Sequence, residues 1–270
     1  ITEPQLIWGS FTHTGDCWFE AVFDLPKLRL VSATFNSDTE ENAEFIAETL
    51  QDILQEARKL NPGFLQSKTG FIVKTTLTFP KDWGLGTSST LVNNIAQWAA
   101  VDAYQLLQNS FSGSGYDIAN AQHNLPILYQ LKNKKPLIKT VDFSPQFSDQ
   151  LYFVYLNKKQ NRKEGIAKYK ENNDDFKNEI HRISEISLEM CSVKSLLDFE
   201  RLIEEHEQII ASIIKLKPVK ELLFPDYLGA IKSLGAWGGD FVLVTGNKST
   251  LQYFKEKGYE TILSYSDMTL

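Results

Sequence analysis

A short segment in the first half of the chain combines two glycines with a run of hydroxyl side chains, at a spacing that could bind phosphate. Residues 79–94 read FPKDWGLGTSSTLVNN. Gly84 and Gly86 permit positive φ angles and a close approach of the backbone to a ligand. Thr87–Ser89 would occupy the first turn of a helix, where unpaired N–H groups and the positive end of the helix dipole favour an anion. The alternative is an ordinary helix capped by a Ser or Thr side chain after a glycine turn.

Local patterns on both sides of this segment predict the elements that hold it. Residues 71–79 (FIVKTTLTF) are rich in β-branched and aromatic side chains, which predicts a strand that ends at Pro80. After the glycines, apolar side chains recur at helical spacing, which predicts one amphipathic helix. These side chains are Leu91, Ile95, Trp98, Ala99, Ala103 and Leu106.

Two further glycine-rich turns follow along the chain. Residues 112–119 read SGSGYDIA, and residues 232–240 read KSLGAWGGD. Asp117, in the first of these turns, is either a helix N-cap, for which Asp is among the best residues, or a carboxylate held beside a reacting phosphate. The later turn is either a glycine-rich hairpin with a packed Trp237 or a tight turn that lies close to a bound nucleotide or to the first glycine loop.

The motifs PxxxGLGxSS, GSGxD and KxxGAxGGD, in this order, resemble the GHMP small-molecule kinase superfamily of galactokinase, homoserine kinase, mevalonate kinase and phosphomevalonate kinase. The resemblance covers Thr75 to the C-terminus, and the GYDIA motif and the GGD ending favour the mevalonate and phosphomevalonate kinase-like branch. It implies an α+β, two-domain GHMP kinase fold, with an N-terminal mixed β/α domain and a C-terminal ferredoxin-like α+β domain. It also implies an ATP-dependent kinase that uses Mg²⁺ and transfers the γ-phosphate of ATP to an acidic isoprenoid-pathway acceptor, mevalonate or phosphomevalonate.

The same resemblance implies roles for individual residues. Asp117 would be the catalytic residue, which accepts the proton of the substrate hydroxyl or stabilises the transition state electrostatically. Ser88 would be a ligand of Mg²⁺ or contact the β- and γ-phosphates. The substrate would contact Ser114, Gly115, Lys158, Lys159 and Arg162. ATP would contact Pro80, Gly84, Leu85, Gly86, Thr87, Ser88, Ser89, Gly235, Ala236, Gly238 and Gly239.

The chain also departs from the pattern of these kinases. Mevalonate kinases carry a glutamate where this chain has residues 106–108 (LLQ), so the carboxylate ligand of Mg²⁺ is unassigned. Leu234 and Trp237 replace residue types that are usual in the third motif. A GKxxLxGEY-like lysine motif is absent from the chain, which we expect to reflect truncation. The alternative is a catalytically impaired homologue that acts as a nucleotide- or ligand-binding regulatory protein.

Composition limits the class of protein. The net charge of −6 argues against nucleic acid as a partner, because binding to phosphates needs a concentrated basic face. Only Cys17 and Cys191 are present, and no apolar run approaches membrane-span length, so we expect a cytoplasmic protein without a membrane partner. The expected partner is a small-molecule anionic substrate, and a homodimer is an option. The basic run of residues 158–170 is either a solvated surface or a loop that closes on that substrate.

Further elements complete the expected organisation. The polar segment 143–149 (FSPQFSD) suggests a boundary between an N-terminal ATP-binding kinase domain, residues 1–148, and a C-terminal GHMP kinase domain, residues 149–270. We expect strands near 5–11, 17–23, 127–131, 137–141, 151–156, 230–233, 241–244 and 261–265. We expect helices near 39–60, from 117, and near 174–190, 193–215 and 249–257.

Overall fold

The computed structural model describes residues 4–36, 43–111, 113–133, 135–158, 175–235, 237 and 239–269. Its residues form two compact units. Unit 1 takes the described residues of Ile1–Lys81, Leu85–His123 and Tyr129–Leu137, and unit 2 takes those of Asp82–Gly84, Asn124–Leu128 and Ile138–Leu270. The domain boundary expected after residue 148 stays a prediction.

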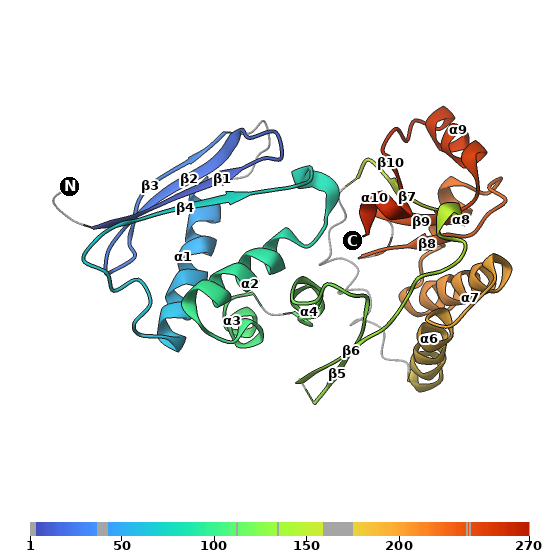
Figure 1. Ribbon diagram of the computed structural model, residues 1–270, viewed down its shortest axis with the longest axis horizontal. Helices are drawn as coiled ribbons and strands as arrows, with labels where there is room; N and C mark the ends of the chain where they lie inside the picture. Colours follow the sequence, from blue (N-terminus) through green and yellow to red (C-terminus); the bar gives the residue numbers. More distant parts are fainter. Residues whose placement is uncertain are drawn as a thin grey trace. The chain divides into compact units, whose positions relative to one another are not determined.

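Unit 1 contains a mixed four-stranded sheet of order β3-β2-β1-β4. Its strands are β1 (Gln5–Phe11), β2 (Cys17–Asp24), β3 (Leu30–Phe35) and β4 (Phe71–Thr76). β1 pairs antiparallel with β2 and parallel with β4. A parallel pair needs a long crossover, and the chain supplies it through β2, β3 and helix α1 (Ala43–Leu60). Figure 1 shows α1 lying across one face of this sheet, and its apolar stripe supplies buried Ala47, Leu50, Ile53, Leu54 and Ala57.

The amphipathic helix expected after the first glycines is two helices, α2 (Thr87–Ala99) and α3 (Ala103–Ser110), so the expectation of one helix was wrong. Ala100 adopts a left-handed conformation, with φ 52°, and ends α2. Asp102 then caps α3, because its side chain accepts a hydrogen bond of 2.7 Å from the backbone N–H of Gln105. Both helices pack into the same core as α1, so the apolar spacing continues across the break.

A short helix and a hairpin complete the first half of the chain. Helix α4 (Tyr116–Ala121) follows the second glycine-rich turn. Strands β5 (Ile127–Lys132) and β6 (Lys135–Thr140) form a two-stranded sheet. A single-turn 3₁₀-helix, η1 (Lys81–Trp83), connects β4 to the first glycines.

Unit 2 has an antiparallel four-stranded sheet of order β10-β7-β9-β8. Of the four strands of this unit, the first along the chain (β7) lies between the fourth (β10) and the third (β9). This is the ferredoxin-like arrangement that was expected for the C-terminal domain. Buried apolar residues such as Val154, Val242 and Val244 fill its core. Its strands are β7 (Leu151–Tyr155), β8 (Ile231–Ser233), β9 (Phe241–Thr245) and β10 (Ile262–Ser264). Its helices are η2 (Ser148–Gln150), α6 (Lys177–Met190), α7 (Leu196–Ile214), α8 (Val219–Leu223), α9 (Lys248–Glu256) and α10 (Tyr265–Met268).

The length and hydropathy of the helices test for a membrane span. Among the described residues, none of the helices is long and apolar enough to cross a membrane.

Candidate active site

The first glycine loop leaves the start of α2 without a side-chain cap. The N-cap residue is Gly86, in a left-handed conformation with φ 73° and ψ 25°, and no side-chain hydrogen bond caps the helix. The first backbone hydrogen bond of α2 runs from the N–H of Thr90 to the carbonyl of Gly86, at 3.0 Å. The alternative of an ordinary Ser- or Thr-capped helix therefore does not describe α2. Its first turn presents backbone N–H groups at the positive end of the helix dipole, with Ser88 exposed.

Asp117 lies beside this turn. It is the second residue of α4, whose N-cap is Gly115, so the alternative reading of Asp117 as the N-cap is wrong. Oδ2 of Asp117 accepts a long hydrogen bond of 3.5 Å from Oγ of Ser89. A Cβ atom built on Gly86 would lie 3.3 Å from Cγ of Asp117. The structure therefore brings the first two motifs together within unit 1.

Tyrosines shape the GSGYD turn. Gly115 has φ 78°, and a Cβ atom there would come within 2.8 Å of Cδ1 of Tyr104. The hydroxyl of Tyr129 donates a hydrogen bond to the carbonyl of Ser114. The Tyr116 and Tyr129 rings meet edge to face, with 5.8 Å between centroids. Burial raises the pKa of Tyr129, so its hydroxyl keeps its proton and remains a donor at neutral pH. Gly115 is thus required for its backbone angle and for its lack of a side chain.

Asp240 connects three predicted segments within unit 2. Its backbone N–H donates to the carbonyl of Lys158 at 2.7 Å, and its carbonyl accepts from the N–H of Leu156 at 2.8 Å. Its carboxylate lies against Gly84, where a Cβ atom would overlap it. The third glycine-rich turn therefore meets Gly84 and the first residue of the basic run, all within unit 2.

The segment before Gly84 is anchored in the same unit. The Trp83 ring packs edge to face on Phe241, with 5.3 Å between centroids. The Tyr155 hydroxyl donates to the carbonyl of Asp82 at 3.0 Å. Strands β7 and β9 thus fix residues 82–84, whereas Gly86 belongs to unit 1.

For the other expected site residues the structure shows only how exposed they are. Pro80 and Leu85 are half-buried, and Ser114, Lys158 and Gly235 are exposed, whereas Gly239 is buried. Ala236, Gly238, Lys159 and Arg162 lie outside the described residues. The roles of all of these residues stay predictions.

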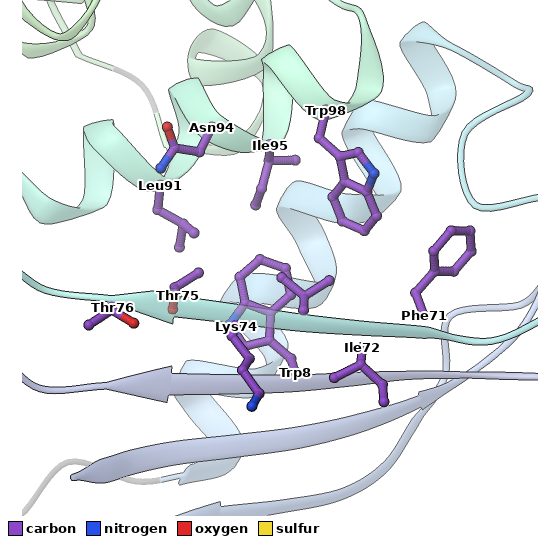
Figure 2. Close-up of a pocket in the computed structure, with 11 residues that line it drawn as sticks. Trp8, Phe71, Ile72, Lys74, Thr75, Thr76, Leu91, Asn94, Ile95 and Trp98 are labelled. Atoms are coloured by element: carbon purple, nitrogen blue, oxygen red, sulfur yellow. The ribbon is translucent and has the colours of Figure 1, made fainter. Parts of the chain in front are cut away.

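A cavity of about 560 Å³ opens between α2 and β4 in unit 1. Figure 2 shows Leu91, Asn94 and Ile95 of α2 facing strand β4, which carries Lys74 and Thr75. None of the expected site residues lines this cavity, and no motif in the sequence points to it.

The role of Ser88 as a ligand of Mg²⁺ stays a prediction. The described part of the chain contains no group of three or more His, Cys, Asp or Glu side chains that could hold a metal. Mg²⁺ retains several waters and needs few protein oxygens, and a serine hydroxyl with one carboxylate is a normal share. Ser88 is a residue of this kind in the first motif, and the carboxylate ligand stays unassigned.

The chain shares a two-domain α+β fold with proteins of known structure. It is similar to the structure of the Lin0012 protein from Listeria innocua, with a TM-score of 0.61 and 15% identity over 97% of this chain and 85% of that chain. It is also similar to Lactococcus lactis galactokinase complexed with galactose, with a TM-score of 0.55 and 10% identity over 95% of this chain and 78% of that chain. The sequence matches no family model and no curated protein. At these identities the similarity establishes the fold.

Proposed function

We propose that this protein is an ATP-dependent small-molecule kinase of the GHMP type. The observation that carries the proposal is the pairing of the α2 N-terminus with Asp117. That turn has a glycine N-cap without a side-chain cap, and Ser89 links it to the carboxylate. Unpaired N–H groups bind phosphate oxygens, and a carboxylate beside that turn can act on a hydroxyl that attacks the phosphate.

Each group has a chemical task in this proposal. The N–H groups of Thr87 and Ser88 hold phosphate oxygens of ATP and reduce the cost of charge development. Asp117 orients the acceptor hydroxyl and takes its proton as the oxygen attacks the γ-phosphorus, while the bond to the β-phosphate oxygen breaks and ADP leaves. Ser88 would hold Mg²⁺, which neutralises phosphate charge when bound. Ser89 keeps the Asp117 carboxylate oriented.

The proposed acceptor is an acidic molecule of the isoprenoid pathway, mevalonate or phosphomevalonate. The GSGYD and GGD endings support this choice. Lys158 supports it also, because Asp240 fixes the start of the basic run beside the third glycine-rich turn. An acceptor with a carboxylate and a phosphate needs more fixed positive charge than a sugar does. The structural similarity to a galactokinase complexed with galactose makes a neutral sugar the competing acceptor.

An assay of ADP release with mevalonate, phosphomevalonate, galactose and homoserine tests the acceptor. We expect turnover with the acidic acceptors, and a higher KM in Lys158→Ala, Lys159→Ala and Arg162→Ala. Lys177→Ala is the matched control, because this exposed lysine pairs with Asp175 at the start of α6. Turnover on galactose alone, or KM values that are the same in all four variants as in the wild type, would reject the acidic acceptor.

A nucleotide- or ligand-binding regulatory protein is the second candidate. Leu106 and Leu107 stand where mevalonate kinases carry a glutamate, and both are buried in the core of unit 1. Asp102, the nearest carboxylate in sequence, caps α3. Binding of β,γ-imido-ATP without ADP release on any acceptor would favour this candidate. Cytoplasmic location and the absence of nucleic-acid and membrane partners remain predictions.

A further inference from the structure

A buried carboxylate joins two residues of the third glycine-rich turn. Glu207 of α7 is 3% exposed. Its Oε1 atom accepts a hydrogen bond of 2.9 Å from Nζ of Lys232 and one of 3.3 Å from Nε1 of Trp237. Lys232 opens the KSLGAWGGD segment and Trp237 lies within it, so one carboxylate oxygen ties both to the same helix.

The charges in this cluster make Lys232 and Glu207 dependent on each other. A buried charge is stable only when it is paired and hydrogen-bonded. His206 lies 3.9 Å from Oε1 of Glu207, but burial, and to a smaller extent Lys232, lowers the pKa of His206 to about 3. His206 is therefore neutral at physiological pH, and Lys232 balances the charge of Glu207.

The backbone of the turn needs an external restraint. Trp237 has φ 65°, a left-handed conformation that is unfavourable for a bulky residue and persists only when the surrounding structure enforces it. Its indole ring is 8% exposed. The hydrogen bond to Glu207 is a restraint of the required kind, because it fixes the ring relative to α7.

Stability alone is a poor explanation for this cluster. Replacing a buried ion pair with apolar side chains is often neutral or stabilising. In addition, Oε2 of Glu207, Nδ1 of His206 and Oγ of Ser233 are buried without a hydrogen-bond partner among the described residues. Unsatisfied buried polar atoms add a further cost. An apolar cluster would hold α7 against β8 as well, so the polar groups need another role.

We propose that Glu207 is a positioning residue that sets the shape of the third glycine-rich turn through Lys232 and Trp237. The part of the proposal that concerns ATP rests on the proposed function, in which this turn contacts the nucleotide. The consequence is that the affinity for ATP depends on a carboxylate of α7 that need not touch the nucleotide.

The test separates shape from stability. The variants are Glu207→Leu, Lys232→Met and the double variant that carries both changes. The control is the same set of changes at Glu204 of α7 and Lys220 of α8, an ion pair with 3.0 Å between Nζ and Oε1 whose side chains are 58% and 26% exposed. Three quantities are measured: the urea midpoint of unfolding, the acrylamide quenching of Trp237 relative to a Trp237→Phe counterpart, and the affinity for β,γ-imido-ATP by calorimetry.

We expect each single change to lower the urea midpoint, because it leaves one buried charge unpaired. The double variant should regain the midpoint, whereas Trp237 stays more accessible to acrylamide and affinity stays about tenfold weaker, equivalent to a loss of about 1.4 kcal/mol. The control pair should leave quenching and affinity unchanged.

Two results would overturn the positioning role. One is a double variant with wild-type quenching and affinity. The other is a double variant as unstable as the single variants, since the pair would then hold the core rather than shape the turn. If the wild-type protein does not bind the ATP analogue, the proposed function fails, and the quenching of Trp237 still decides whether Glu207 positions the turn.

Discussion

The Asp240 carboxylate packs directly on the Cα atom of Gly84, so that a side chain at Gly84 would occupy the same space. Both residues have left-handed backbones, with φ 68° at Gly84 and φ 53° at Asp240. Asp240 is 6% exposed. Gly84 and Asp240 are therefore matched in shape within unit 2, and glycine is required at position 84 for space as well as for backbone angle.

Gly84→Ala should lower the free energy of unfolding of the protein by about 1–3 kcal/mol more than a glycine-to-alanine change without overlap. Gly258→Ala is the control, because Gly258 has φ 87° and a Cβ atom there would meet nothing within 4 Å. Urea unfolding measures both variants. Adding Asp240→Ala to Gly84→Ala should recover part of the loss, and equal losses in Gly84→Ala and Gly258→Ala would contradict the steric explanation.

Gly86→Val should abolish binding of β,γ-imido-ATP while the protein remains folded. The branched side chain is strained at φ 73°, and it extends toward the Asp117 carboxylate and the open turn of α2. Calorimetric titration measures the affinity. Gly15→Val carries the same backbone strain at φ 92° in open space, so it should keep wild-type affinity. Wild-type affinity in Gly86→Val would reject the phosphate loop.

Asp117→Asn should reduce the rate of phosphoryl transfer by about 10²–10⁴-fold with nearly unchanged affinity for ATP, because the charge is lost and the shape is kept. Single-turnover kinetics separate the two quantities. Ser89→Ala should cause a much smaller loss, since it removes only the 3.5 Å hydrogen bond to the carboxylate. Full turnover in Asp117→Asn would exclude a role of Asp117 in the chemistry.

The free energy of unfolding should decrease as the pH is lowered from 6.5 toward the pKa of His206 in the folded protein. Burial lowers this pKa to about 3. In this range the unfolded chain binds a proton at His206 and the folded chain does not. The free energy of unfolding should therefore decrease by up to about 1.4 kcal/mol per pH unit as pH falls. Urea unfolding from pH 7 to pH 5 tests this, a range above the titration of most carboxylates.

His206→Leu should have a weaker dependence of stability on pH over that range than the wild type. The control is His181→Leu, because His181 has a side chain that is 77% exposed and pairs with Glu185 on α6. That variant should keep the wild-type slope. Identical slopes in all three proteins would show that His206 does not titrate as inferred.

Local patterns in the sequence predicted most of the elements but not all of their ends. The strand expected at residues 5–11 is β1 with the same bounds. The break between α2 and α3 was missed, although Asp102 followed by Gln105 is a capping pattern that could have indicated it. Strand β3 was missed too, although LVSATF is rich in residues that favour strands.

Long-range pairings in the site could not be read from the sequence. The glycine motifs suggested that the third glycine-rich turn could approach the first glycine loop, but nothing in their spacing placed the Asp240 carboxylate on Gly84. Glu207 looks like one more charge in the polar run of residues 204–208 (EEHEQ), and only the fold shows that it is buried against Lys232 and Trp237. Tyr129 has no motif at all, and its hydroxyl reaches Ser114 only because the hairpin after α4 turns back.

The single carboxylate oxygen that accepts from both Lys232 and Trp237 also constrains how this chain can diverge. Loss of Lys232 alone would leave Glu207 buried with its charge uncompensated, and loss of Glu207 alone would strand the lysine. Evolutionary intermediates in which only Glu207 or only Lys232 has changed are therefore expected to be selected against. Homologous proteins are expected to keep Glu207, Lys232 and Trp237 together. Otherwise they should carry glycine at the position of Trp237 and apolar residues at the positions of Glu207 and Lys232.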